Sequence, residues 1–220
     1  MSYLINIDKD TDLYGSFALK AGSKGCNFFN TWFDKLGINA IYKSFSVKDI
    51  EQAVQAALTL DMKGFAITMP FKSDVLKHVD KLTRDVEKIG AANTIVNKDG
   101  VLTAHNTDFL AAQDLLKDFG YLFRAGKHTP FYILGNGGYS KAVQYAAKRL
   151  NLIFAVITRE EWPELRDIRD SLIFNCTPTV NIIDASNTYI DCRTSSRTGL
   201  ALSQKQASYQ FKIYTGHELP

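Results

Sequence analysis

Residues 131–158 contain the pattern that most restricts how this chain folds. The apolar run Phe131–Gly135 is typical of a buried strand, Lys141–Leu150 of a helix and Ile153–Thr158 of a second strand. A glycine-rich turn, Gly135–Ser140, joins the first strand to the helix. Strands joined through a helix lie parallel in one sheet, so this stretch predicts an α/β fold.

The turn itself favours binding of a dinucleotide. Its glycines let the backbone approach a pyrophosphate, and N–H groups at the N-terminus of the following helix stabilise the phosphate charge. The residues predicted to contact the cofactor here are Gly135, Asn136, Gly137, Gly138, Tyr139 and Ser140. A glycine cluster alone also makes an ordinary tight turn, so it is the surrounding strand and helix that favour the binding interpretation.

The first 120 residues predict a second α/β unit. Its predicted strands are Tyr3–Ile7, Leu13–Gly15, Ile41–Phe45, a strand ending at Met69, Ala92–Val96 and Val101–His105. The predicted helices are Asn27–Leu36, Val47–Leu60, Lys72–His78, Lys81–Ile89 and one from Thr107 or Asp108 to Lys117, with a loop at Ser16–Gly25. The alternation indicates a parallel sheet, and Asp99-Gly100 signals a β-hairpin near its end.

Composition narrows the class of protein. With 45% hydrophobic and 22% charged residues, the chain is typical of a globular protein. Its net charge of +3 is too small to indicate binding to nucleic acid or to an anionic membrane, and no apolar run reaches the ~20 residues of a membrane-spanning helix. The N-terminus lacks a signal-peptide pattern and Cys26, Cys176 and Cys192 lack paired spacing, so we expect a cytoplasmic protein with reduced thiols and no metal site.

Three short polar motifs carry the chemistry. An apolar run stops at Pro70, which has no N–H for strand pairing, and presents Thr68 and Lys72 at the turn. Asn93 and Asp108 lie in the next two motifs. An amine at a strand end suits proton transfer, and a nearby carboxylate such as Asp108 would balance its charge. Two alternatives stay open: an exposed helix-start lysine for Lys72, and a helix N-cap for Asp108.

These motifs, T-x-P-F-K at 68–72, G-A-x-N-T at 90–94 and N-T-D at 106–108, resemble the shikimate dehydrogenase family in their order and approximate separation. The resemblance implies a catalytic pair, Lys72 and Asp108, and substrate contacts from Thr68 and Asn93. It also implies an NADP-dependent oxidoreductase of aromatic amino acid biosynthesis. The reaction would be the reversible reduction of 3-dehydroshikimate or a related small cyclic carboxylate.

The same resemblance extends to other residues around the substrate. Relatives hold the substrate carboxylate with two loop serines, and a His-Asn pair opens the next helix. Here Ser23 matches the first serine, Gly25 replaces the second, and Phe29 replaces the histidine. Ala66 departs from the family's usual asparagine, and Gln206 matches a glutamine that reaches the substrate. The alternatives are a solvated loop hydroxyl for Ser23 and a surface-helix glutamine for Gln206.

The implied cofactor contacts also extend beyond the glycine turn. Relatives carry an arginine facing the 2′-phosphate of NADP at the end of the second strand, where this chain has Thr158 and Arg159. Glu160 and Glu161 follow directly and disfavour a phosphate, so NADP is predicted and NAD is the alternative. The remaining predicted cofactor contacts are Thr177 and Gly199.

The expected architecture is α/β in two lobes. A substrate-binding and catalytic domain is predicted at residues 1–106, and a shortened Rossmann-like NAD(P)-binding domain at 107–197, with a linker at 118–129. A C-terminal helix at 198–220 is expected to return to the first lobe. The shortening leaves a second hypothesis, a non-catalytic descendant that binds a small carboxylate. The expected partner is a small-molecule carboxylate, and the expected assembly is a monomer or homodimer.

Overall fold

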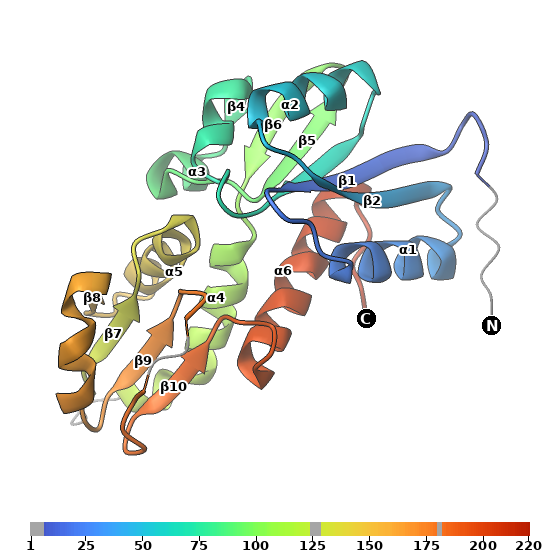
Figure 1. Cartoon of the computed structure of the whole chain (residues 1–220). Helices are drawn as coiled ribbons and strands as arrows, with labels where there is room; N and C mark the ends of the chain where they lie inside the picture. The colour runs from blue at the N-terminus through green and yellow to red at the C-terminus, as the bar shows by residue number, and fades with distance from the viewer. Residues whose placement is uncertain (1–6, 124–128, 180–181) are drawn as a thin grey trace. The chain divides into compact units, whose positions relative to one another are not determined.

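The computed structural model describes residues 7–123, 129–179 and 182–220, and the chain divides into two compact units (Figure 1). Unit 1 comprises residues 1–106 and 210–220, and unit 2 comprises residues 107–209. The return of the C-terminal segment to unit 1 confirms the prediction for the last helix. The predicted strand Tyr3–Ile7 and linker 118–129 lie partly outside the described residues, at 3–6 and 124–128.

Unit 1 has, within the described residues, a six-stranded sheet in the order β2-β1-β3-β5-β6-β4. Its strands are β1 Asp12–Ala18, β2 Ala40–Ser46, β3 Gly64–Ile67, β4 Lys81–Leu82, β5 Thr94–Lys98 and β6 Val101–His105. Its helices are α1 Lys24–Leu36, α2 Ile50–Thr59, η1 Asp74–His78 and α3 Arg84–Ile89. Strands β1, β2 and β3 run parallel as predicted, whereas β5 is antiparallel to both β3 and β6.

The β5–β6 hairpin explains why the sheet is mixed. Asp99 and Gly100 both have positive φ, 54° and 83°, which is the conformation that a two-residue hairpin turn requires. The Asn97 side chain accepts a hydrogen bond from the Gly100 N–H at 2.9 Å and fixes the turn. The hairpin predicted from Asp99-Gly100 is therefore confirmed.

Several predicted elements were wrong at their ends by a few residues, and two of these differences change strand pairing. The loop predicted at Ser16–Gly25 is shorter, because Ser16 to Ala18 complete β1 and Lys24 begins α1. The small residues at 15–16 hid this strand, which is held by its pairing with β2 and by a buried Ser16–Ser44 hydroxyl bond of 3.0 Å. The helix predicted at Lys81–Ile89 begins at Arg84, because residues 81 and 82 pair with β6 as β4.

Each face of the unit 1 sheet has its own core. Helix α2 covers one face, where Val54, Phe65 and Ile95 are fully buried (Figure 1). Helix α1 and the end of the last helix cover the other face with aromatic rings, and Phe29 and Phe211 stack 6.1 Å apart there. The C-terminal segment is therefore part of the unit 1 core.

Unit 2 has, within its described residues, a four-stranded parallel sheet in the order β10-β9-β7-β8. Its strands are β7 Phe131–Leu134, β8 Ala155–Ile157, β9 Leu172–Asn175 and β10 Thr188–Asp191. Its helices are α4 Asp108–Asp118, η2 Gly120–Phe123, α5 Gly138–Arg149, η3 Arg159–Asp167 and α6 Arg197–Thr215, whose last turns belong to unit 1. The chain leaves β7 for β8 on one side and later returns to β9 on the other. This reversal of strand order is where open α/β sheets bind ligands.

Candidate functional site

The turn after β3 is held by backbone hydrogen bonds. The Thr68 N–H donates to the Phe17 carbonyl at 3.0 Å, and the Thr68 carbonyl accepts from the Phe71 N–H at 2.9 Å. Thr68 is exposed and Lys72 is half-buried. The Lys72 carbonyl accepts from the Ala92 N–H at 2.8 Å, which ties this turn to the second polar motif.

The second motif is tied in turn to β3 and to the third motif. The Asn93 carbonyl accepts from the Ile67 N–H at 2.9 Å, and the Asn93 N–H donates to the His105 carbonyl at 3.2 Å. The Asn106 side chain donates to the Ala91 carbonyl at 2.9 Å. Hydrogen bonds thus connect residues 64–72, 90–94 and 105–106 in unit 1. We call this connected set of residues the motif edge.

Asn93 is nearly fully buried, at 1% exposure, and its side chain is oriented by neighbours. Its Oδ1 accepts from the Thr94 hydroxyl at 2.9 Å. The Gln210 Nε2 donates to that hydroxyl oxygen at 2.9 Å and to the Asn93 carbonyl at 3.0 Å. Sequence reasoning did not identify Gln210, because its partners lie more than 110 residues earlier in the chain. A glutamine on the buried face of the last helix was the only signal.

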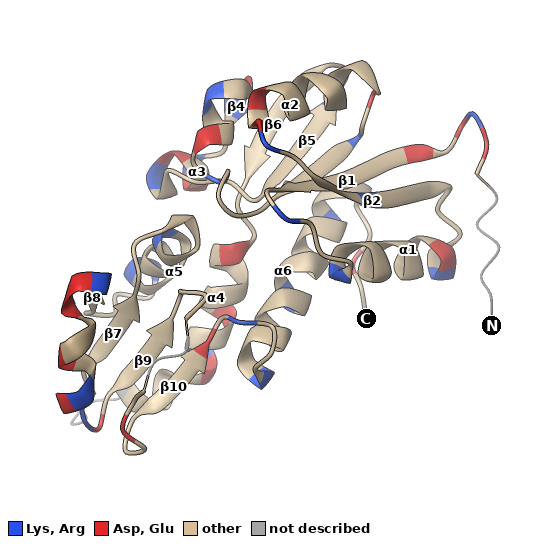
Figure 2. Ribbon diagram, in the orientation of Figure 1, with Lys and Arg blue, Asp and Glu red and all other residues tan. Residues whose placement is uncertain are grey.

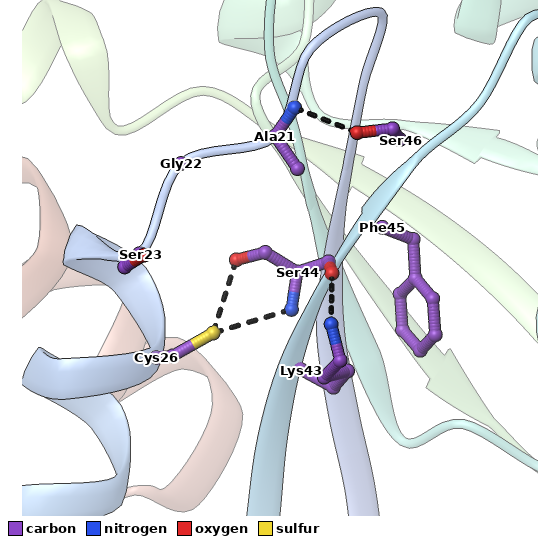
Figure 3. Close-up of a pocket in the computed structure, with 8 residues that line it drawn as sticks. All are labelled: Ala21, Gly22, Ser23, Cys26, Lys43, Ser44, Phe45 and Ser46. Atoms are coloured by element: carbon purple, nitrogen blue, oxygen red, sulfur yellow. Dashed lines mark hydrogen bonds between the residues drawn. The ribbon is translucent and has the colours of Figure 1, made fainter.

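Ser23 lies on the far side of β1, at the N-cap of α1, and is exposed. It borders a hollow of about 350 Å³ (Figure 3). The residues lining the hollow are Ala21, Gly22, Ser23, Cys26, Lys43, Ser44, Phe45 and Ser46. Much of the polar lining is bonded internally, because the Ser44 N–H donates to the Cys26 sulfur at 3.3 Å and the Lys43 amine to the Ser44 carbonyl at 2.7 Å. These bonds also occupy backbone groups of β2, an edge strand of the sheet.

The departures at positions 25 and 29 have one structural cause. Phe29 is buried and stacks on the Tyr42 ring at 4.3 Å between centroids. A Cβ at Gly25 would lie 3.0 Å from the same Tyr42 ring. A serine at position 25 and a histidine at position 29 would therefore both disturb this aromatic pair.

Asp108 is the first residue of α4 and is buried, with 4% exposure. Thr107 holds the N-cap position, so the N-cap alternative for Asp108 is wrong. The fully buried Thr107 hydroxyl donates to the Gln206 Oε1 at 3.3 Å. Unit 2 therefore brings the predicted substrate residue Gln206 beside the residue preceding Asp108.

The Asp108 carboxylate acts on two neighbours in unit 2. Burial raises the pKa of the Tyr139 hydroxyl, and the nearby Asp108 charge raises it further. Burial also raises the pKa of the Cys176 thiol, with Cys192 and Asp108 adding to the shift. Asp108 thus lies at the end of the unit 2 sheet that carries the glycine turn.

The glycine turn fits the approach of a phosphate. Gly135 has φ of 94°, and a Cβ there would lie 2.8 Å from the Thr177 methyl group. The Ser140 hydroxyl donates to the Gly135 carbonyl at 2.6 Å and holds the turn closed. Gly137 is the N-cap of α5, where it offers no side chain to cover the first N–H groups of the helix. The predicted residues Asn136, Gly138 and Tyr139 follow in the same turn, and Thr177 borders it.

Thr158 and Arg159 lie at the end of β8, as the sequence predicts. Thr158 is the N-cap of η3 and is bonded to Glu161, whereas the Arg159 guanidinium lies over the Trp162 ring. Gly199 lies in the first turn of α6, where a Cβ would meet the Arg193 carbonyl oxygen at 2.1 Å. Packing alone therefore requires a glycine at position 199.

Other site types find less support in the structure. The described residues hold no group of three His, Cys, Asp or Glu side chains placed to bind a metal ion. The cysteines Cys26, Cys176 and Cys192 are not in disulfides. Among the described helices, none is both long and apolar enough to cross a membrane.

Known proteins similar to this chain share one description. The profile of the "Shikimate dehydrogenase substrate binding domain" matches residues 21–95. A shikimate dehydrogenase-like protein from Haemophilus influenzae is 37% identical over 142 residues, which are 64% of this chain and 51% of that protein. The shikimate dehydrogenase (NADP(+)) of Pyrococcus furiosus is 39% identical over 122 residues, 55% of this chain and 44% of that enzyme. The chain thus matches about half the length of these curated relatives.

The fold is that of the same proteins. A solved structure of a shikimate 5-dehydrogenase-like protein superposes with a TM-score of 0.80 at 26% identity, covering 97% of this chain and 95% of that one. Shikimate dehydrogenases with the same fold have been solved with NADP+ and with NAD and shikimate.

Proposed function

Because this chain belongs to the shikimate dehydrogenase family, we propose that it is an NAD(P)-dependent oxidoreductase acting on a small cyclic carboxylate of the shikimate type. The motif edge carries this proposal. It joins the backbone at Lys72, Asn93 and His105 through direct hydrogen bonds, so the residues with acid–base and polar side chains share one edge of unit 1. The similar enzyme from Pyrococcus furiosus is named a shikimate dehydrogenase (NADP(+)).

The roles of the residues follow from their chemistry. Lys72 would give a proton to the substrate oxygen in the reducing direction and take it back in the other, and Asp108 would orient and balance its amine. Thr68 and Asn93 would hydrogen-bond the hydroxyl groups of the ring, and Gln206 would contact the substrate from α6. Ser23 would hold the substrate carboxylate. A bound nicotinamide would supply or accept the hydride.

We assign substrate binding to residues 1–106, cofactor binding to 107–197, and completion of the first domain to 198–220. Support for cofactor binding comes from the glycine turn, where a Cβ at Gly137, the N-cap of α5, would meet nothing within 4 Å, so the first N–H groups of the helix stay accessible to a pyrophosphate. Arg159 favours NADP over NAD by its charge, and this preference stays a prediction from sequence.

A second candidate function is binding without catalysis. Two observations favour it. The described residues of unit 2 form a sheet of four strands, as expected for a shortened cofactor domain, and the chain matches about half the length of its relatives. The two functions differ in whether a nicotinamide dinucleotide binds and reacts.

Calorimetric titration of NADPH and NADH into the full chain, paired with cofactor-dependent oxidation of shikimate, separates them. An oxidoreductase binds one of the two cofactors and oxidises shikimate or a related cyclic hydroxy acid. Absence of binding to both cofactors would leave only the second candidate.

A further inference from the structure

The first turn of η3 binds a carboxylate from the same chain, that of Glu161. The Thr158 N–H and the Thr158 hydroxyl both donate to the same carboxylate oxygen of Glu161, each at 2.8 Å. The Glu161 side chain reaches back three residues to do this, the geometry of a capping box. The two donors at the end of β8 are thereby occupied.

The negative charge at this turn is firmly held. Hydrogen bonds from the backbone and side chain of Thr158 lower the pKa of Glu161. The Thr158 side chain also lowers the pKa of Glu160, so both carboxylates are ionised at neutral pH. Figure 2 shows acidic and basic residues together at the start of this helix, which lies beside β8.

Arg159, the positive group of this turn, is directed to an aromatic ring. Its guanidinium carbon lies 5.5 Å from the centre of the Trp162 ring, within the range of a cation–π interaction. The indole N–H of Trp162 is buried and, in the part of the chain that the structure describes, has no hydrogen-bond partner. The arginine is therefore held on the Trp162 face, while Glu161 holds the Thr158 donors.

The first turn of η3 lies at the strand end where a dinucleotide-binding unit contacts the adenosine ribose. Strand β8 pairs with β7, which leads into the glycine turn. In a dinucleotide-binding βαβ unit, the end of the second strand is where the adenosine ribose is read: an acidic residue suits a free 2′-hydroxyl, and an arginine suits a 2′-phosphate. Here the Glu161 carboxylate accepts from both strand-end donors, while the Arg159 guanidinium lies over the Trp162 ring.

We propose that Glu161 sets the cofactor choice, acting as a built-in anion that excludes the 2′-phosphate, so that this chain binds NADH more tightly than NADPH. The inference rests on the proposed function, and it reverses the preference that Arg159 predicts from sequence. A 2′-phosphate would have to displace the carboxylate from Thr158 and would also be repelled by it. A 2′-hydroxyl needs neither step.

The test is calorimetric titration of NADH, NADPH, ADP and adenosine 2′,5′-bisphosphate into the full chain. Five variants are compared with the unaltered protein: Glu161→Gln, Glu161→Ala, Arg159→Ala, the double variant Arg159→Ala/Glu161→Ala, and the matched control Glu164→Gln. Glu164 is an exposed glutamate one turn further along η3. Glutamine preserves the capping bond, so Glu161→Gln removes the charge without removing the cap. The ratio of the two affinities is the readout, because misfolding would weaken both.

We expect the unaltered protein to bind NADH more tightly. Loss of one like charge at hydrogen-bond range should raise NADPH affinity by roughly tenfold in Glu161→Gln and change NADH affinity by less than about twofold. Adenosine 2′,5′-bisphosphate should follow NADPH, and ADP should follow NADH. Arg159→Ala should cost NADPH affinity in the Glu161→Ala background and have little effect in the unaltered protein.

Three results would overturn the inference. Tighter binding of NADPH by the unaltered protein would do so, as would an affinity ratio that stays constant across both Glu161 variants. These two leave the proposed function intact. Failure of every protein to bind either dinucleotide would overturn both proposals together.

Discussion

Unit 1 and unit 2 position their candidate residues by different means. In unit 1 the motif edge is built from main-chain bonds, such as Ala92 N–H to the Lys72 carbonyl and Asn93 N–H to the His105 carbonyl. In unit 2 the positions depend on side-chain contacts. The Thr107 hydroxyl donates to Gln206, and Gly135 has no Cβ to collide with the Thr177 methyl group. Replacing Lys72, whose link to Ala92 is made by the backbone, should therefore change chemistry more than structure. Replacing Gly199, or a side chain that bonds a distant segment such as Gln210, should change stability.

The two sheets also differ in the number of strands that the structure describes. The described part of unit 1 has six strands and two separate cores, and the matched family profile lies entirely within it. Unit 2 has four described strands with β8 at an edge. As an edge strand, β8 pairs with β7 alone among the described strands, and at its end the Glu161 side chain caps the following helix.

The largest expected effect is on chemistry in unit 1. Lys72→Ala should lower turnover of a shikimate-type substrate by at least about 10²-fold, the usual scale for a general acid–base group. Because the Lys72 link to Ala92 is made by the backbone carbonyl, stability should change little. Steady-state kinetics measures the loss of turnover, and thermal melting measures the change in stability.

Lys77→Ala is the matched control for that substitution, since Lys77 is exposed and forms an ion pair with the nearby Asp74. It should retain normal turnover. Near-normal turnover in Lys72→Ala would remove Lys72 from the mechanism, and a large loss of stability would contradict the main-chain origin of the motif edge.

The next effect is on stability in unit 2. Gly199→Ala would place a Cβ 2.1 Å from the Arg193 carbonyl oxygen, which is backbone and must move. Overpacking of this kind costs roughly 1–3 kcal/mol, more than the gain of up to about 1 kcal/mol from alanine in a helix. Chemical denaturation measures the loss. Gly22→Ala, where a Cβ would meet nothing within 4 Å, is the control and should be close to neutral.

Much of this arrangement could be predicted where the signal is local. The Asp99-Gly100 hairpin and the glycine turn between β7 and α5 each lie within a few residues of sequence, and both form as predicted. Thr158 and Glu161 have the Thr-x-x-Glu spacing of a capping box, so this contact is also encoded in local sequence.

The parts that could not be predicted depend on distant partners. Ser16 belongs to β1 because β2 pairs with it, and nothing in its own neighbourhood indicates a strand. Gln210 supports Asn93 from 117 residues away. Sequence patterns report on near neighbours along a helix or strand, so a contact between distant segments has no periodic signature.

Adjacent residues of α6 offer a direct comparison of the units. Gln210 donates to Asn93 and Thr94 in unit 1, and the Tyr209 hydroxyl donates to Asp114 at 2.5 Å in unit 2. Gln210→Leu removes the donor to the Thr94 hydroxyl oxygen and one of two donors to the Asn93 carbonyl, and should cost about 1–3 kcal/mol, whereas Tyr209→Phe should cost only about 0.5–1.5 kcal/mol. Two lysines also bond Asp114 and stay in place in the second variant.

Hydrogen exchange resolved by residue distinguishes the two losses. Gln210→Leu should speed exchange at the amides of Ile67 and Thr94, and Tyr209→Phe should speed exchange in α4. If each substitution loosened both units equally, α6 would be joining them into one cooperative structure, and the contrast between the units would not hold.

The smallest expected effect is a dependence of stability on pH that belongs to unit 1. Burial lowers the pKa of His105 below its ordinary value of 6.5. The unfolded chain therefore takes up the proton more readily than the folded chain once the pH falls below about 6.5. The free energy of unfolding should decrease from there down to the folded pKa, below which this residue adds no further slope.

His105→Gln should remove that part of the slope, measured by chemical denaturation of the full chain between about pH 5 and 8, the range in which histidine titrates. His217→Gln, at an exposed position near the C-terminus, is the control and should preserve the slope. Because the His105 carbonyl accepts from the Asn93 N–H through the backbone, the motif edge should survive the substitution, and turnover at neutral pH should be retained. An unchanged slope in His105→Gln would show that the pH dependence arises elsewhere, and lost turnover would show that the motif edge depends on this side chain.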